Sequence, residues 1–212
     1  MIDPDAWARE AEDRVLDKAL ELAPALGWTR PAAGAAGRAC GLSDADVELL
    51  LPNGGADLAA LLARRHDARA LAELAAVDVQ ALKIRQRIRR AVEAHLDAAT
   101  ESPEALRRWA GFLALPHHLP LALRLLWDSA DKLWRWAGDT ATDENHYSKR
   151  TILSAILAGA LAIRLKDGKD AAMAFVDARI DNVMAFEKWK AGLKPQDALR
   201  DVAAALGKLR YG

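Results

Sequence analysis

The spacing of apolar residues predicts a chain built of amphipathic helices. Between residues 5 and 25, apolar side chains recur every three or four positions opposite a row of acidic residues, the pattern of a helix with one buried face. This apolar stripe consists of Val15, Leu16, Ala19, Leu22 and Ala23. Helix caps, glycines and prolines divide the rest of the chain into further predicted helices, which start after Gly27, cover about 43–51, 56–76, 77–99, 103–115 and 121–137, start again near Thr142, and cover about 170–190 and 195–210.

One predicted helix differs from the others because it is apolar on all sides. Residues 151–163 hold Ile and Leu at every angular position, which predicts a helix that is buried all round. Such a helix is either central in a large fold, or it places one face on the core and another on a second subunit. Its small residues, Ala155, Ala158, Gly159 and Ala162, would let two backbones approach closely. We therefore expect a homodimer through this helix and the next.

Composition agrees with an all-α fold. The apolar content is mainly Ala and Leu, whereas Val, Ile, Thr and aromatic residues are sparse. A chain of 212 residues fits one domain, or one domain with a small lobe. We divide it into a helix-turn-helix unit over residues 1–55, a helical ligand-binding and dimerisation domain over 56–192, and a terminal amphipathic helix over 193–212.

The three predicted N-terminal helices have the spacing of a helix-turn-helix, and they resemble the N-terminal domain of TetR-type repressors. The helix in the recognition position carries Asp44, Asp46 and Glu48 and no basic residue. Residues 1–62 hold five Lys and Arg against eleven Asp and Glu, a net charge of −6. Because phosphate neutralisation supplies most non-specific DNA affinity, we expect no nucleic-acid binding from this degenerate unit. A TetR-type regulator that binds a hydrophobic effector is the alternative function.

Charge and cysteine content exclude several further classes. The formal net charge is zero and Cys40 is the only cysteine, so neither bulk electrostatic attraction nor an internal disulfide is expected. The acidic N-terminus predicts no signal peptide, and the run from Thr151 to Ile163 is shorter than the roughly 20 residues that a membrane span needs. We expect a cytoplasmic protein, with a peripheral contact to the inner face of the cell membrane as an option.

No catalytic, cofactor or metal-ligand motif is visible in the sequence. The adjacent His117 and His118 point to different faces of any helix and would make a poor chelate, so no metal site is predicted. The hypothesis of an enzyme rests only on polar residues near a presumed cavity, such as Asp131, Asp139 and Tyr147. We expect a non-catalytic protein without a cofactor.

Polar and aromatic residues are densest between Leu126 and Arg150, a stretch that holds three of the seven tryptophans. Trp127 and Trp134 lie on one helical stripe, which is typical of a core and also of a ligand cavity. We predict that both tryptophans are buried. The residues at the start of the following helix, Asp143, Asn145, His146 and Tyr147, are predicted to be at least partly exposed and to face a protein partner.

The same stretch resembles the signature of the Coq-nine family of ubiquinone-biosynthesis accessory proteins. The matching residues are Trp127, Ala130, Asp131, Trp134, Gly138, Asp139, Thr142, Asp143, Asn145, Tyr147, Lys149 and Arg150. Supporting matches lie in Gly27-Trp28, in Leu82 to Arg89, in Leu115 to Leu123 and in Phe175 to Ile180. They run in family order from about residue 12 to 190.

This resemblance implies a TetR-like all-helical homodimer without catalysis, whose hydrophobic cavity holds an isoprenoid quinone precursor or another lipid. It also implies docking to the membrane hydroxylase of the ubiquinone pathway around Asp143, Asn145, His146 and Tyr147. Family members usually have Phe and Trp in place of Glu144 and His146. Candidate cavity residues are Ile84, Ile88, Phe112, Leu123, Trp127, Trp134, Leu153, Ile156 and Leu157. If the terminal helix lies on a membrane instead of the core, its membrane-facing residues are Leu199, Val202, Leu206 and Leu209.

Overall fold

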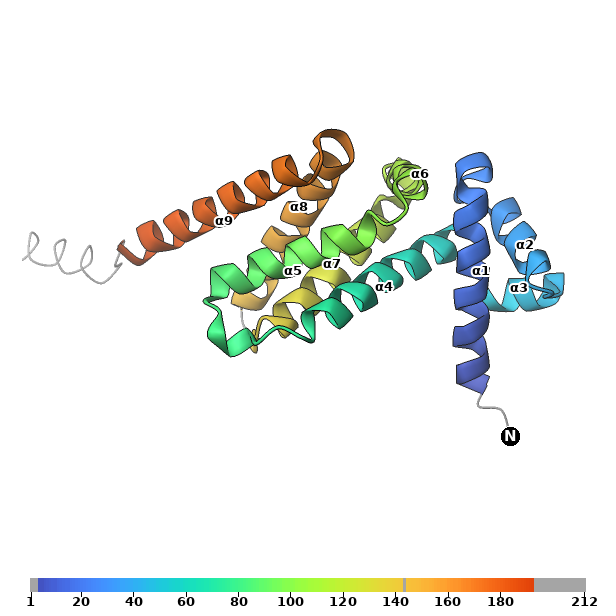
Figure 1. Ribbon diagram of the computed structural model, residues 1–212, viewed down its shortest axis with the longest axis horizontal. Coiled ribbons are helices and arrows are strands. Elements are labelled where there is room, and N and C mark those ends of the chain that lie inside the picture. Colours follow the sequence, from blue (N-terminus) through green and yellow to red (C-terminus); the bar gives the residue numbers. More distant parts are fainter. Residues whose placement is uncertain (1–3, 143, 193–212) are drawn as a thin grey trace, which may run out of the picture.

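The computed structural model describes residues 4–142 and 144–192, with side-chain surroundings for 6–142 and 144–185. Within these residues the fold is all-helical, as predicted. The order of the helices along the chain and the three-helix N-terminal unit agree with a TetR-like arrangement (Figure 1). The predicted membrane-facing residues of the last helix lie outside the described residues. The helices are α1 (Pro4–Leu26), α2 (Arg30–Ala39), α3 (Asp44–Leu50), α4 (Gly55–Leu74), α5 (Ile84–Ala99), α6 (Pro103–Leu113), α7 (Leu119–Trp136), α8 (Glu144–Asp167) and α9 (Lys169–Gly192), with 3-10 turns η1 (Val79–Ala81) and η2 (Pro116–His118).

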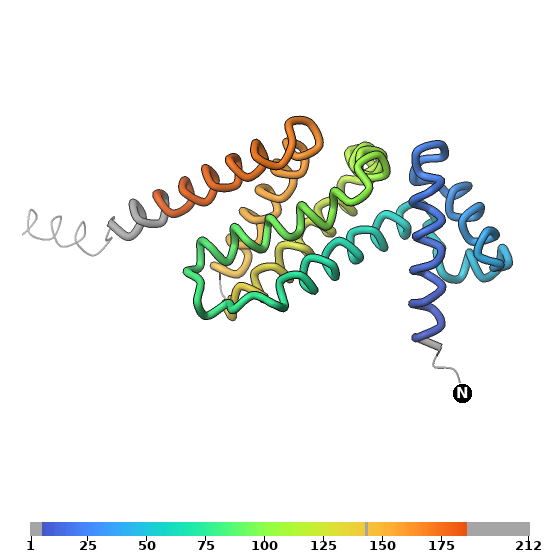
Figure 2. Tube along the Cα trace, viewed as in Figure 1, coloured from blue at the N-terminus to red at the C-terminus, as the bar shows by residue number. Residues whose placement is uncertain are grey.

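Helices α1 to α3 form a compact unit at one end of the molecule, beside the start of α4 (Figure 2). Side-chain caps fix the starts of its short helices. The Thr29 hydroxyl accepts a hydrogen bond from the amide of Ala32, and the Ser43 hydroxyl accepts one from the amide of Asp46. The Asp46 carboxylate accepts the Ser43 amide in return at 2.9 Å, which completes a capping box. The sequence-predicted helix-turn-helix spacing is therefore held by local hydrogen bonds.

Tryptophan side chains connect this unit and the following helices. The buried Trp28 ring donates to the carbonyl of Ala105 at the start of α6, and Trp109 of α6 donates to the carbonyl of Ala59 in α4. Trp136 of α7 donates to the carbonyl of Leu74, the last residue of α4, at 3.3 Å. The Leu74 carbonyl has no partner within its own helix and also accepts the amide of Val77 at 3.0 Å, so the indole adds a second hydrogen bond to it. Each of these three indoles thus combines a large apolar surface with one inter-helical hydrogen bond.

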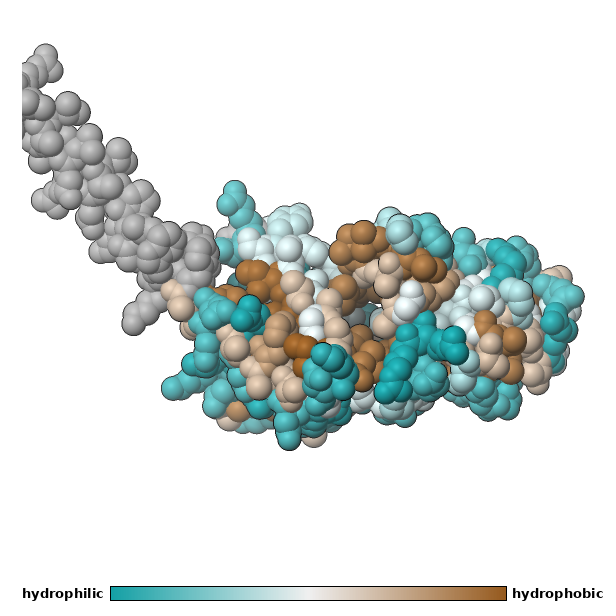
Figure 3. Space-filling view, turned by 90° about the horizontal axis from the view of Figure 1, so that it is seen from above, coloured by the Kyte–Doolittle hydropathy of each residue, from teal (hydrophilic) through white to brown (hydrophobic). Residues whose placement is uncertain are grey.

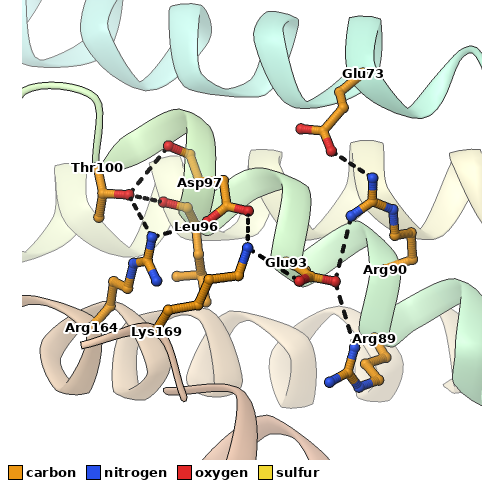
Figure 4. Close-up of polar contacts among 9 residues, drawn as sticks. All are labelled: Glu73, Arg89, Arg90, Glu93, Leu96, Asp97, Thr100, Arg164 and Lys169. Atoms are coloured by element: carbon orange, nitrogen blue, oxygen red, sulfur yellow. Dashed lines mark hydrogen bonds and ion pairs between the residues drawn. The ribbon is translucent and has the colours of Figure 1, made fainter. Parts of the chain in front are cut away.

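Ion pairs on the surface of α5 connect it to α4, α8 and α9 (Figure 4). Arg90 donates to Glu73 of α4 at 2.6 Å, and Glu93 receives Lys169 of α9 at 3.2 Å. Asp97 receives both Lys169 and Arg164. Exposed ion pairs of this kind each contribute little to the free energy of unfolding, but a network of shared partners orders several side chains together.

The predicted helix over 77–99 is wrong at its beginning. The chain makes the turn η1 after Asp78, whose carboxylate caps the amide of Gln80, and Leu82 and Lys83 are extended. Helix α5 starts only at Ile84, so Val77 and Ala81 belong to no helical stripe with Ile88. The prediction failed because the hydrogen bond from the Gln80 amide to the Asp78 side chain stabilises a turn in place of the first helical turn.

Residues 151–163 are not buried all round in the single chain, so the first of the two alternatives, a helix central in the fold, is wrong. In α8, Leu153, Ile156, Leu157 and Ala160 are buried, but Ile152 is 40% exposed and Ala155, Ala158 and Ala162 are exposed. Helix α8 therefore has a core face and an open face. Among the described residues, no helix has the length and hydropathy to cross a membrane.

Candidate functional site

The corner between α7 and α8 is shaped by a glycine. Gly138 has a φ of +91°, a left-handed conformation that favours glycine. The amide of Gly138 donates to the carbonyl of Arg135, and the amide of Asp139 donates to the carbonyl of Trp134, each at 3.0 Å. These two hydrogen bonds form a Schellman motif, which ends α7 and turns the chain toward α8. Arg87 of α5 donates to the Ala137 carbonyl at 3.0 Å and so caps the same helix end.

A buried arginine joins the two sides of this corner. Arg150, in the second turn of α8, is 1% exposed. Its Nε donates to Asp131 of α7 at 2.7 Å, and its Nη1 donates to Asp139 at 2.8 Å and to the His146 carbonyl at 3.2 Å. Lys149 completes the cluster with a 2.6 Å bond to Asp139. The charges are therefore paired and hydrogen-bonded, as burial requires.

The electrostatics of these carboxylates disfavour the enzyme hypothesis. Burial opposes ionisation of Asp139, but hydrogen bonds from Lys149 and Arg150 outweigh it and hold the pKa of this carboxyl below its usual range. Burial is likewise outweighed at Asp131 by Arg150 and Arg135, which lower its pKa. Both groups stay ionised and bound to cations near neutral pH. This arrangement suits a structural corner rather than proton transfer.

The corner carries an aromatic cluster, which we define as Trp127, His146 and Tyr147. The Trp127 ring centroid lies 6.3 Å from that of His146 and 6.0 Å from that of Tyr147, and the latter two lie 5.2 Å apart. The His146 Nδ1 lies 3.0 Å from the Ala141 carbonyl, which holds the ring in place. Tyr147 is 63% exposed. The cluster is thus a half-open aromatic surface.

This geometry corrects the expected division of the stretch. Trp127 and Trp134 are half-buried rather than buried, and Trp127 packs on His146 and Tyr147 instead of facing a cavity. Trp134 donates its ring N–H to the Lys149 carbonyl at 3.0 Å. The predicted exposure of Asn145 and Tyr147 is confirmed, and His146 is half-buried. Asp143 lies outside the described residues.

A central cavity of about 320 Å³ lies among α4 to α8. Figure 3 shows apolar surface on both sides of a depression in the middle of the molecule. The volume is at the lower end of the range for small-molecule sites. The lining is Ala63, His66, His95, Ala99, Trp109, Ala110, Leu113, Ala114, Leu119, Ala122, Leu125, Leu126, Ser129, Leu157, Ala158, Leu161, Ala162 and Leu165.

One wall of the central cavity is polar and lies beside the ion pair between the buried Asp67 and the partly exposed Lys132. His66 and His95 are buried, and so are Asp67 and Ser129. Lys132 donates to the Asp67 carboxylate at 2.6 Å. Burial opposes ionisation of Asp67, but contacts with His95, Lys132 and Ser129 lower its pKa. The wall thus places two imidazole rings and a hydroxyl group beside a compensated charge.

A second, lateral cavity of about 390 Å³ lies among α5, α8, α9 and the corner after α7. It is lined by Ile84, Arg85, Arg87, Ile88, Trp134, Ala137, Gly138, Asp139, Asn145, Ser148, Lys149, Ile152, Leu153, Ile156, Ile180, Val183 and Met184. Helix α8 separates the two cavities, because Leu153 and Ile156 face the lateral one whereas Leu157 and Leu161 face the central one.

The predicted cavity residues are divided between these sites. Ile84, Ile88, Trp134, Leu153 and Ile156 line the lateral cavity, and Leu157 lines the central one. Three others line neither cavity: Phe112 stacks on His118, Leu123 is 59% exposed, and Trp127 belongs to the aromatic cluster.

The polar wall of the central cavity was missed by the sequence analysis. His66 follows two arginines and precedes Asp67, a run that is typical of an exposed helix face. His95 lies 29 positions further on, and only the tertiary fold brings it beside Asp67.

The N-terminal unit offers little to a phosphate backbone. Arg30 pairs with Glu48 at 2.8 Å and Arg38 pairs with Asp44 at 3.0 Å, so two cations of α2 face the acids of α3. These pairs reduce the positive charge that α2 offers to phosphate groups, and the absence of DNA binding stays a prediction from charge.

Comparison with known proteins gives one consistent family. The model of the COQ9 family matches residues 119–187. The chain is 28% identical to the human "Ubiquinone biosynthesis protein COQ9, mitochondrial", covering 82% of this chain and 58% of the relative. It is 29% identical to the rat protein and 27% identical to that of Xenopus tropicalis, with 82% of this chain and 59% and 58% of those relatives covered. The chain therefore spans rather less than two thirds of the length of these relatives.

Replacing the buried arginine tests its role at the corner. Arg150→Leu leaves Asp131 and Asp139 without their shared cation, and we expect the free energy of unfolding in urea to fall by roughly 3–5 kcal/mol. Arg135→Leu is the matched control, since Arg135 binds the same Asp131 from the surface and its loss should cost less than about 1 kcal/mol. Equal losses in the two variants would contradict the account.

His66 should give the protein a specific pH dependence. Burial, and secondly repulsion from His95, lower the pKa of His66 from 6.5 to about 3. Between these values the unfolded chain takes up a proton that the folded chain does not. The contribution of the neutral His66 to the free energy of unfolding is therefore fully present above pH 6.5. It decreases as the pH falls below this value, by up to about 1.4 kcal/mol per pH unit. Urea titrations at a series of pH values from 7 to 5 give the free energy of unfolding as a function of pH. This free energy should decrease less steeply with falling pH in His66→Phe than in the wild-type protein. An equal decrease in both would be evidence against a neutral buried imidazole.

Proposed function

Because the chain belongs to the COQ9 family, we propose that it is a non-catalytic lipid-binding accessory protein of ubiquinone biosynthesis. In this proposal it holds an isoprenoid quinone precursor and presents it to a membrane-associated hydroxylase of the pathway. The relatives carry ubiquinone biosynthesis in their names, and the matched region includes the α7–α8 corner and most of α8 and α9.

The observation that carries the proposal is the central cavity. All but three of its lining residues, His66, His95 and Ser129, are apolar, and the walls include Trp109 and four leucines of α6 and α7. Removing an isoprenoid chain from water into such a cavity gains about 25 cal/mol for each Å² of apolar surface buried. The exposed Leu119 lies on the rim, so a long tail can continue outside the enclosed volume along apolar surface.

Presentation of the lipid needs a docking surface, and the aromatic cluster is the best candidate. His146 and Tyr147 lie in the first turn of α8 and Trp127 packs on them from α7. Helix α8 also forms the wall of the central cavity at Leu157. Exposed aromatic side chains on a rigid support are frequent binding hot spots. The buried Arg150 keeps this support rigid by tying the His146 carbonyl to Asp131 and Asp139.

We also propose that two copies associate through the open face of α8. Ile152 and Ala155 are exposed there, and their neighbours Ala158 and Ala162 lie at the open side of the central cavity. Small side chains permit close approach of a second helix, and covering the exposed Ile152 would remove its apolar surface from water, which favours association. A second copy on this face would also shield bound lipid from water.

Lipid content is the direct test of binding. Protein purified without detergent, extracted and measured by mass spectrometry should contain an isoprenoid quinone or its phenolic precursor. Ala122→Trp places a large ring in the central cavity and should remove most of this lipid. Ala68→Trp, on the exposed side of α4, is the control that should retain it. Absence of lipid from the wild-type protein, or equal lipid in both variants, would count against the proposal.

Docking can be tested on the aromatic cluster. Tyr147→Ala removes its most exposed ring and should weaken binding to the demethoxyubiquinone hydroxylase about tenfold, the effect of an interface hot spot. Leu49→Ala is the control, because Leu49 is an equally prominent apolar residue on α3. Biolayer interferometry with the purified hydroxylase measures both, and an unchanged dissociation constant for Tyr147→Ala would exclude the cluster as a docking site.

A further inference from the structure

We propose that the wall formed by His66, His95 and Ser129 recognises the neutral, oxygen-bearing ring of the ligand, and that this ring enters the central cavity ahead of its apolar tail. The inference rests on the proposed function, in which this cavity holds a lipid. It adds the side chains that recognise the ring and the direction of the ring in the cavity.

His66 supplies the first argument. Its imidazole is buried and lines the central cavity, and no hydrogen bond to it is present among the described residues. The edge-to-face contact with Trp109, at 6.0 Å between centroids, holds the ring without using its nitrogens. Since burial keeps the pKa of His66 near 3, the ring is neutral and offers one N–H donor and one nitrogen acceptor. A buried imidazole without partners is costly unless a ligand or water supplies them.

His95 and Asp67 supply the second argument. The His95 Nδ1 lies 3.4 Å from the Asp67 Oδ1, but the two are not aligned as a hydrogen bond, and both atoms are buried without a partner. Asp67 is compensated by Lys132, so its charge does not call for a cationic ligand. The nearby carboxylate favours a proton on Nδ1, so Nε2 is the nitrogen of this cavity-lining ring that is left for a ligand oxygen.

The lining selects the charge of the head group. No Lys, Arg, Asp or Glu is among the residues that line the central cavity. A carboxylate or phosphate head would therefore be buried without a counter-ion in the lining, at a high desolvation cost. A phenol hydroxyl can donate to a neutral imidazole nitrogen, and a quinone carbonyl can accept from an imidazole N–H. The wall thus fits a phenol or quinone better than a fatty acid or phospholipid.

The direction follows from the position of the polar wall. His66 and His95 are buried, whereas Leu119, Ala158 and Ala162 on the lining are exposed. A ring at the histidines therefore leaves its tail pointing toward the apolar rim. The opposite orientation would leave the buried nitrogens without partners and place the polar head at the leucines.

The test uses three ligands with the same tail and ring: 4-hexylphenol, hexylbenzene and 4-hexylbenzoate. Calorimetric titration of the full chain at pH 7.5 should give a dissociation constant for the phenol about three- to tenfold lower than for the hydrocarbon, the effect of one net hydrogen bond. The benzoate should bind more weakly than both. His66→Phe keeps an aromatic ring but should abolish the advantage of the phenol, and His66→Gln should retain part of it. His118→Phe, outside the cavity lining, should leave it unchanged.

The possible failures are distinct. If none of the three ligands binds, both the proposed function and this inference are wrong. If phenol and hydrocarbon bind equally, or if His66→Phe keeps the preference, the cavity holds lipid but the polar wall does not recognise its head, and ordered water satisfies the histidines instead. Preferred binding of the benzoate would overturn the assignment to neutral heads. The comparison among ligands on the wild-type protein needs no variant to fold.

Discussion

The guanidinium of Arg150, buried between Asp131 and Asp139, is the interaction on which the functional part of the fold depends. It joins the end of α7 to the start of α8 across the turn at Gly138. Because charges can be buried only when they are paired and hydrogen-bonded, the three side chains fix one another. Helix α8 leaves this point in a set direction, and its two sides become the walls of the central and lateral cavities. One ion cluster therefore positions both the aromatic cluster and the α8 wall of the central cavity.

The central cavity combines two properties that are rarely found together in a simple core. Its lining is apolar enough to favour an isoprenoid chain, and it contains two histidines. Among the described residues, His66 has no hydrogen bond and the Nδ1 of His95 is buried without a partner. The nearby charges of Asp67 and Lys132 cancel each other and are not among the lining residues. An apolar tail and a neutral polar ring thus find matching surfaces in one place.

The helices could be predicted from the sequence because burial and capping are local signals. The stripe of Val15, Leu16 and Ala19 and the caps at Thr29 and Ser43 lie where periodicity and residue type indicate. The site could be predicted only in part. Trp127 lies on an apolar stripe, but its packing on Tyr147 depends on how α8 crosses α7. Arg150 and His66 belong to polar sequence runs and become buried only through partners that are distant in the chain. Tertiary placement of polar residues leaves no periodic pattern, so these positions needed the structure.

A crystal structure of the protein bound to a short-chain analogue of the quinone precursor tests the central claim most directly. The account predicts the ring of the ligand in the central cavity, with an oxygen within hydrogen-bond distance of His66 or His95, and the tail running past Leu119. A ligand bound only in the lateral cavity, or one whose tail lies at the histidines while its ring lies at the rim, would contradict it.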